Sequence, residues 1–120
     1  MHPTYLLVFL ALLFGCSEKS PYQTIRVKRG EVFEIKLEAQ IATGYRWRLM
    51  DSLDTRYVEL LNTQYQEATR PDVDGGMGTE VWSFRANAAG KAVIRFLYNP
   101  AWQKDKTADS KERIFEIIID

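Results

Sequence analysis

Only two residues of this chain carry a thiol or an imidazole, the groups most often used as nucleophiles, bases and zinc ligands, and both lie near its amino terminus. They are Cys16, the one cysteine, and His2, the one histidine. Downstream of Cys16, neither a Ser-His-Asp nor a Cys-His arrangement can be built, and no zinc site can be drawn from cysteine and histidine. The rest of the chain is therefore suited to binding rather than to catalysis.

Acidic and glycine-rich segments add no enzymatic motif. The segment DVDG at 72–75 is too short for a calcium-binding EF-hand loop and lacks its distant glutamate. The segment GGMG at 75–78 lacks the lysine and the following helix of a phosphate-binding loop. Scattered surface carboxylates leave a hydrolytic enzyme as a third alternative. We expect a protein that is not an enzyme and that uses no cofactor or metal.

The amino-terminal segment differs in composition from everything after it. Residues 5–14 read YLLVFLALLF, ten apolar residues, which is short of the roughly 20 that span a membrane but typical of a secretory signal. The segment LFGC at 13–16 resembles the lipobox at which bacterial lipoproteins are cleaved and lipidated. We expect a signal peptide at 1–15, a lipidated Cys16 and linker at 16–22, and one domain at 23–120. The alternative is a soluble secreted or intracellular protein with one free thiol.

Cleavage before Cys16 would leave 120 − 15 = 105 residues, enough for one small domain with a single core. We then expect an exported lipoprotein, periplasmic or at the cell surface, held to the membrane by its lipid alone. The 16 basic and 16 acidic residues balance, so no nucleic-acid footprint is present. With one cysteine there is no internal disulfide, and apolar packing must stabilise what we expect to be a monomer.

The elements that must position any binding residues are strands. After a polar linker, apolar residues recur at every second position with almost no helical periodicity, which indicates half-buried strands. The alternation predicts about seven strands, containing residues 24–28, 33–37, 45–49, 58–64, 82–86, 92–98 and 115–119. The same spacing assigns Tyr45, Trp47, Trp82 and Phe84 to the core. Seven short antiparallel strands in about 100 residues fit an immunoglobulin-like sandwich, with a closed barrel as the structural alternative.

Three connections between these strands are long or irregular, at residues 38–44, 66–78 and 99–112. Loops of such length are usually functional or disordered. They are the second, fourth and sixth connections. Because successive strands of a sandwich alternate in direction, we expect all three at the same end of the molecule.

Motifs on these three loops resemble the chagasin-type inhibitors of papain-like cysteine peptidases. TGYRW at 43–47 resembles their Asn-Pro-Thr-Thr-Gly-Tyr-x-Trp segment, and GMGTEVWSF at 76–84 resembles their glycine-rich loop that runs into Trp-x-Phe. YNPAW at 98–102 resembles their Tyr-x-Arg-Pro-Trp segment. The motifs match in order and spacing across residues 25–119.

The resemblance implies an immunoglobulin-like domain whose three loops form a wedge in the cleft of a papain-like cysteine peptidase. It implies that the first loop covers the catalytic cysteine and that the two flanking loops straddle the cleft. The residues expected to contact the peptidase are Ala42, Thr43, Gly44, Gly76, Met77, Gly78 and Trp102. Trp102 is the expected hot spot, and the glycines allow a close approach of the backbone.

The chain departs from the family pattern at two loops. Gln40, Ile41 and Ala42 stand where the family has Asn, Pro and Thr, and Pro100 and Ala101 stand where it has Arg and Pro. These changes predict looser loops and a faster dissociation. They also motivate an alternative function, an envelope module that binds another protein or a glycan without inhibiting peptidases.

Overall fold

The structure, a computed structural model, describes residues 22–67 and 78–120. These residues contain seven strands and one short 3-10 turn: β1 (Tyr22–Val27), β2 (Val32–Ala39), η2 (Ile41–Thr43), β3 (Tyr45–Leu49), β4 (Val58–Gln66), β5 (Gly78–Ala86), β6 (Gly90–Pro100) and β7 (Lys111–Ile119). The strand positions predicted from the alternation are confirmed, with bounds that shift by a few residues. In this part of the chain no helix is long and apolar enough to cross a membrane.

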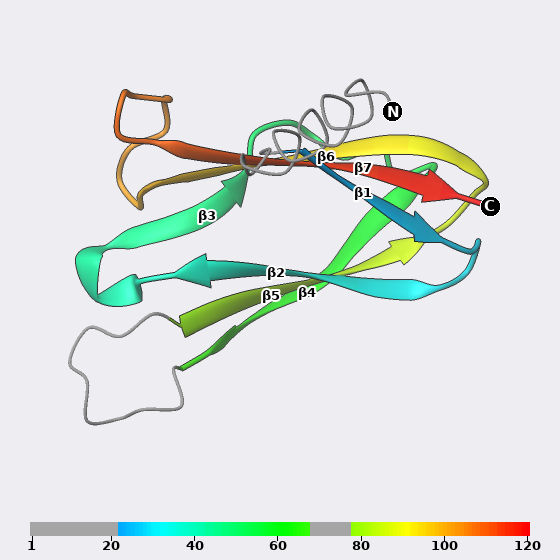
Figure 1. The fold of residues 1–120 in the computed structure, drawn as a ribbon, viewed down its shortest axis with the longest axis horizontal. Coiled ribbons are helices and arrows are strands. Elements are labelled where there is room, and N and C mark those ends of the chain that lie inside the picture. Colours follow the sequence, from blue (N-terminus) through cyan, green and yellow to red (C-terminus); the bar gives the residue numbers. More distant parts are fainter. Residues whose placement is uncertain (1–21, 68–77) are drawn as a thin grey trace, which may run out of the picture.

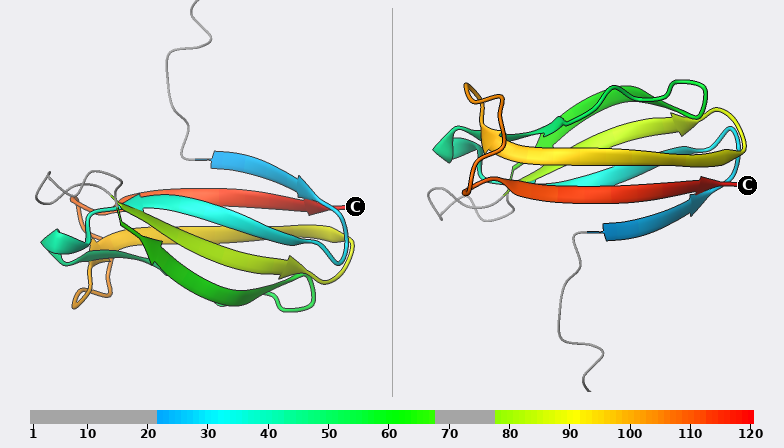
Figure 2. Two further views of the ribbon diagram at one scale, coloured as in Figure 1. Left: turned by 90° about the horizontal axis from the view of Figure 1, so that it is seen from below. Right: turned by 90° about the horizontal axis from the view of Figure 1, so that it is seen from above.

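The strands form two sheets that pack face to face (Figure 1). One sheet has the order β1-β7-β6-β3, and the other has the order β2-β5-β4. Both sheets run the length of the molecule, as the two side views in Figure 2 show. The expected sandwich is therefore confirmed.

One pairing differs from the expected antiparallel arrangement. β1 pairs with β7 in parallel, from Tyr22 opposite Ile114 to Val27 opposite Ile119. The other four strand pairings are antiparallel. The cause is the odd number of strands: when direction alternates along the chain, the first and seventh strands run the same way and must be parallel if they are neighbours.

The core lies between the sheets and is built from the inward face of each strand. Period-two alternation is visible in β2, where Phe33, Ile35 and Leu37 are buried between exposed residues. Phe96 on β6 is fully buried, and its ring contacts rings from both sheets. Its partners, with centroid distances, are Trp82 (5.0 Å), Phe115 (5.8 Å), Phe84 (6.4 Å) and Trp47 (6.5 Å). The aromatic cluster joins the two sheets.

Short turns close the end of the sandwich where the carboxyl terminus lies (Figure 1). Gly30 has a φ of 89°, a left-handed conformation that glycine adopts without strain. The link between β3 and β4 is also a turn, because the amides of Tyr57 and Val58 both donate to the carbonyl of Asp54. The Arg56 guanidinium donates to the Asp54 carboxyl and lowers the pKa of that group. This end is compact, so the long connections belong to the other end.

Candidate functional site

The end of the sandwich opposite the carboxyl terminus is the candidate site, and we call it the tip. It comprises residues 40–44 with η2, the amino-terminal end of β5 at Gly78, and the connection from β6 to β7 at residues 101–110. All three lie at the same end in Figure 1. The predicted convergence is therefore confirmed for the first and third loops. Gly76 and Met77 of the second loop, like Cys16, lie outside the described residues.

The first loop is a single tight turn. The amide and the side-chain hydroxyl of Thr43 both donate to the carbonyl of Gln40, at 3.2 and 2.6 Å. Gly44 follows with a φ of 84°, which lets the chain reverse directly into β3. Ala42 and Thr43 are exposed, so their small side chains and backbone form the outermost surface of this turn.

Trp102 from the third loop packs onto the first. A side chain added at Gly44 would meet ring atom Cζ3 of Trp102 at 3.1 Å, so the indole rests on the bare glycine backbone. The amide of Ala101 donates to the carbonyl of Gly44 at 2.9 Å. Despite this contact, Trp102 is 77% exposed. The two loops thus form one unit that presents an aromatic surface to solvent.

Gly78 has a role that sequence reasoning did not assign. It is buried at the start of β5, and a side chain there would overlap the Tyr65 hydroxyl and the carbonyl of Gln66. Glycine is therefore required for packing against β4. Direct contact of Gly78 with a partner protein remains a prediction.

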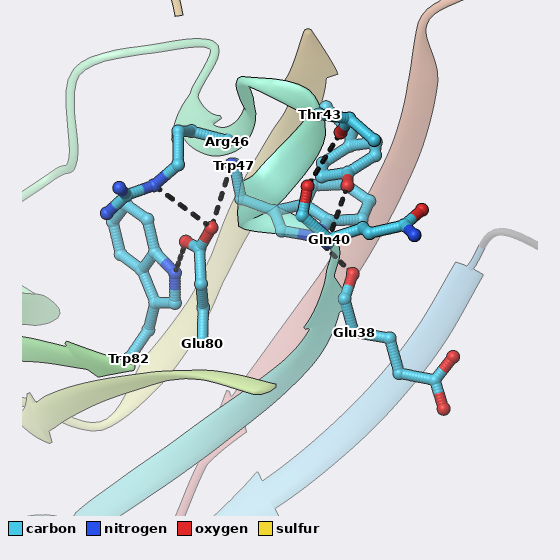
Figure 3. Close-up of polar contacts among 8 residues, drawn as sticks. Glu38, Gln40, Thr43, Arg46, Trp47, Glu80 and Trp82 are labelled. Carbon is cyan, nitrogen blue, oxygen red and sulfur yellow. Dashed lines mark hydrogen bonds and ion pairs between the residues drawn. The ribbon is translucent and has the colours of Figure 1, made fainter. Parts of the chain in front are cut away.

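A buried carboxyl group lies directly behind the tip (Figure 3). Glu80 on β5 is only 2% exposed, and its two oxygens accept hydrogen bonds from the backbone amide of Trp47 at 3.2 Å and the indole of Trp82 at 3.1 Å. The Arg46 guanidinium lies 3.6 Å from the same carboxyl group. β3 is the edge strand of its sheet, so its outer backbone groups have no strand to pair with. Glu80 accepts a hydrogen bond from one of these groups and thereby links β3 to the other sheet.

Two more hydrogen bonds fix the base of the first loop. The Tyr98 hydroxyl accepts from the amide of Gln40 at 2.9 Å, and the Trp47 indole donates to the carbonyl of Glu38 at 2.9 Å. Both aromatic side chains are buried, as expected for Trp47 from its spacing. Figure 3 shows Glu38, Gln40 and Trp47 next to the cluster around Glu80.

The third loop is organised by Asn99, which sequence reasoning placed in that loop and which lies in β6. Asn99 is 1% exposed, and its amide donates to the carbonyls of Asp105 at 2.8 Å and Gln103 at 3.5 Å. Its carbonyl accepts from the Ser110 hydroxyl. The loop therefore folds back over the outer face of β6, and the Asn99 side chain joins three of its residues.

Of the two buried polar residues, Glu80 and Asn99, only Glu80 could have been placed in the interior from the sequence. Glu80 precedes Trp82 and Phe84 at the same period-two spacing, so an inward position could have been inferred for it. Asn99 gave no such signal, because it points to the outer face and is buried only by the loop that folds over it.

The described residues of the tip form a surface that is suited to binding. Among residues 22–67 and 78–120, no three histidine, cysteine or acidic side chains gather in a way that could hold a metal ion. What the tip presents is exposed backbone, small side chains and one indole on a rigid base. These features suit occlusion of a surface groove on another protein.

Comparisons with known proteins agree with this geometry. The model of a family described as "Chagasin family peptidase inhibitor I42" matches residues 26–119. The crystal structure of the cysteine protease inhibitor EhICP2 from Entamoeba histolytica is similar, with a TM-score of 0.68 and 18% identity over 81% of this chain and 86% of that one. No curated protein matches the chain in sequence.

Two further solved structures share the fold. PbICP-C, in complex with falcipain-2, has a TM-score of 0.63 and 17% identity over 82% of this chain and 88% of that one. The solution structure of Amebosin has a TM-score of 0.62 and 22% identity over 81% and 88%. At such identities the likeness concerns the fold.

Proposed function

The chain belongs to the chagasin family of peptidase inhibitors, and from this membership we propose that it reversibly inhibits papain-like cysteine peptidases by placing its tip in their active-site cleft. The observation that carries the proposal is the unit formed by Gly44 and Trp102, with the indole 77% exposed. Tryptophan is one of the residues most enriched among the hot spots of protein interfaces. Similar folds occur in the inhibitor EhICP2 and in PbICP-C bound to falcipain-2.

In this mechanism no bond is made or broken by the inhibitor. Ala42, Thr43 and Gly44 would approach the catalytic cysteine with backbone and small side chains, which exclude the substrate by occupancy. Trp102 would contact one wall of the cleft, and Gly76, Met77 and Gly78 the other. An interface of this kind buries roughly 800 Å² on each partner.

Rigidity of the tip supports affinity, because a loop already held in its bound conformation loses less entropy on binding. Two hydrogen bonds provide such rigidity, one from the amide of Ala101 to the carbonyl of Gly44 and one from the amide of Gln40 to the Tyr98 hydroxyl. They do so although Ile41 and Ala101 replace the family's two prolines. The expected looseness of these loops is thus offset in part by hydrogen bonds.

Titration of the chain from Ser17 onward, which contains all seven strands, against papain tests the proposal. We expect reversible inhibition that competes with a small peptide substrate. Absence of inhibition at micromolar concentration, with a sample whose circular dichroism shows a folded β protein, would contradict it. Papain whose catalytic cysteine carries a small blocking group serves as a binding control. The chain should still bind it, because occupying the cleft requires no reaction with the thiol.

A second function is an envelope module that uses the same tip to bind another protein or a glycan. It is favoured by Gln40, Ile41, Pro100 and Ala101, which replace the family's residues on two loops. A pull-down that recovers a partner other than a peptidase, and that is lost in Trp102→Ala, would support it. Recovery that survives this change would exclude the version based on the tip.

We further propose that residues 1–15 are a signal peptide and that lipid on Cys16 anchors a monomeric domain to a membrane, in the periplasm or at the cell surface. The sequence at 13–16 supports this, and β1 begins at Tyr22, so residues 17–21 would form the tether. Mass spectrometry of the mature chain and fractionation of Cys16→Ser test it. A wild-type chain that keeps residues 1–15, or a Cys16→Ser chain still held in the membrane, would refute it.

A further inference from the structure

The outer face of the β3–β6 pair contains a hollow that the family signatures do not touch. Leu97 points to this outer face yet is only 3% exposed. It lies at the bottom of a hollow of about 280 Å³ that borders the third loop. The hollow is lined by Arg48, Leu49, Met50, Leu97, Lys104, Asp105 and Lys106. Its volume is below the range of about 300–1,000 Å³ for small-molecule sites, so it suits one functional group rather than a whole ligand.

The lining carries more positive than negative charge. Of its three cations, Lys106 already pairs with Glu112 at 2.8 Å, outside the hollow. Lys104 is exposed and makes no ion pair within the described part of the chain. Arg95 nearby is balanced by Asp51 and Glu112, at 3.1 and 3.8 Å. Arg48 and Lys104 therefore outnumber Asp105, the one acidic side chain of the lining, and leave an excess of positive charge there.

Arg48 also has an unsatisfied donor. Its Nη2 atom is buried and has no hydrogen-bond partner among the described residues. A guanidinium group has five N–H donors in a planar fork, and a buried donor of a charged group without an acceptor is unfavourable. An anionic acceptor placed in the hollow would remove this penalty if the guanidinium turned toward it. A carboxylate matches the fork with two parallel hydrogen bonds.

We propose that this hollow binds a carboxylate side chain of the protein that the tip engages. Lys104 lines the hollow and lies two residues after Trp102 on the same loop, so a partner that contacts the indole can reach this part of the lining. The identity of that protein as a peptidase rests on the proposed function. The site would then contribute to specificity. A partner with an acidic residue beside its cleft would be favoured, whereas a partner with a basic residue there would be repelled by Arg48 and Lys104.

The first test uses the free protein and needs no peptidase. The chain from Ser17 onward is titrated with sodium acetate at constant ionic strength, and the side-chain Nε–H signal of Arg48 and the amides of residues 104–106 are followed by NMR. We expect saturable shifts that disappear in Arg48→Gln. Shifts that do not saturate, or that appear equally at Arg26 near the opposite end, would overturn the proposal. Inorganic phosphate that binds more tightly than acetate would overturn the assignment to a carboxylate.

The second test uses a peptidase that the wild-type chain inhibits. Loss of one charge-assisted hydrogen bond predicts that Arg48→Gln and Lys104→Gln each raise Ki at least about tenfold, chiefly through faster dissociation. Arg26→Gln removes an equal charge that is 68% exposed and pairs with Asp120, so it should leave Ki unchanged. Equal effects at Arg26 and Arg48 would indicate only long-range attraction and would overturn the proposal, as would unchanged values at both Arg48 and Lys104.

The two tests separate the proposals. If the wild-type chain inhibits no peptidase, the proposed function fails while the acetate titration still decides whether the hollow binds a carboxylate. If Arg48→Gln does not fold, Lys104→Gln decides, because Lys104 is an exposed loop residue.

Discussion

Folding alone gives no reason for a tryptophan to lie where Trp102 does. The indole contacts Gly44 through one edge and remains 77% exposed, although its loop is already closed by the hydrogen bonds of Asn99. Tryptophan is enriched among interface hot spots, which become buried near the centre of the interface when the partner binds. A change at Trp102 should therefore affect binding to a partner but not the stability of the fold.

Replacement of Trp102 by alanine should weaken inhibition by at least about 2 kcal/mol, the threshold for a hot spot. The free energy of unfolding should change by less than about 0.5 kcal/mol, as for other surface substitutions. Inhibition assays and urea unfolding measure the two effects. Val93→Ala, an exposed apolar residue on the outer face of β6, is the control and should change neither. A loss of stability without a loss of inhibition would assign the indole to packing.

Gly44 and Gly30 provide a matched pair. Both have left-handed φ angles, 84° and 89°, but a side chain at Gly44 would meet the Trp102 ring at 3.1 Å while one at Gly30 would meet nothing within 4 Å. Alanine at either position should destabilise the fold by about 1–2 kcal/mol, the strain of a left-handed residue. Only Gly44→Ala should also displace the indole and raise Ki. Equal Ki values for the two variants would show that the indole is not held by this contact.

Strand β3 is a short edge strand, and it needs support on its open side because it follows the first binding loop directly. Glu80 provides this support through the amide of Trp47. In Glu80→Gln the side-chain amide would face a donor, leaving one N–H buried without an acceptor. We expect a loss of about 1–3 kcal/mol in the free energy of unfolding.

The control for Glu80→Gln is Glu59→Gln on β4, whose ion pair with Arg85 is exposed and spans 3.4 Å. Exposed pairs contribute about 0–1 kcal/mol, so this variant should be close to wild type. Urea unfolding compares the two, and inhibition assays at low temperature show whether the first loop stays in place. A Glu80→Gln chain as stable as Glu59→Gln would mean that the buried cluster does not support β3.

The third loop depends on Asn99 in the same way that β3 depends on Glu80. Removal of the amide in Asn99→Ala leaves the carbonyls of Gln103 and Asp105 without their donor. Amide hydrogen exchange over residues 103–110 should become faster, and inhibition should weaken because Trp102 belongs to the same loop. Asn87→Ala, which removes a similar bond to the carbonyl of Thr55 at the other end, should leave both unchanged. Unchanged exchange in Asn99→Ala would contradict the proposed role.

What the sequence could predict follows from local periodicity. Tyr45, Trp47, Trp82 and Phe84 were assigned to the core because every second residue of a half-buried strand points inward. The last three are buried, whereas Tyr45 is only half-buried and packs against the core at its end near the tip. Convergence of the first and third loops followed from alternating strand direction. The loop that buries Leu97 and Asn99 could not be predicted, because it depends on hydrogen bonds between residues that no periodic pattern links.

The same limit applied to pairing between strands. Alternation of direction predicted antiparallel neighbours, but which strands are neighbours depends on how the sheets pack, and β1 joins β7 in parallel. This pairing places β1, the first strand, at the edge of the four-stranded sheet. The amide of Asp120 donates to the carbonyl of Val27, so the pairing of the first and last strands continues to the end of the chain.

At the scale of the whole sandwich, one core supports both sheets and therefore the first and third loops of the tip. Phe96 connects β6 to Trp47 on β3, Trp82 on β5 and Phe115 on β7. Trp47 and Trp82 in turn contact Glu80, so the aromatic cluster extends to the base of the binding loops. The sheets should therefore not unfold separately.

Phe96→Ala tests this coupling. Removal of a fully buried phenyl ring should lower the free energy of unfolding by about 3–5 kcal/mol, while Phe96→Leu, which keeps most of the volume, should lower it by less. In both variants, near-ultraviolet and far-ultraviolet circular dichroism should report one common transition, because a core shared by two sheets is lost all at once. Two separate transitions would show that the sheets unfold independently, and the tip would then be supported by only one of them. The leucine variant decides the matter if the alanine variant does not fold.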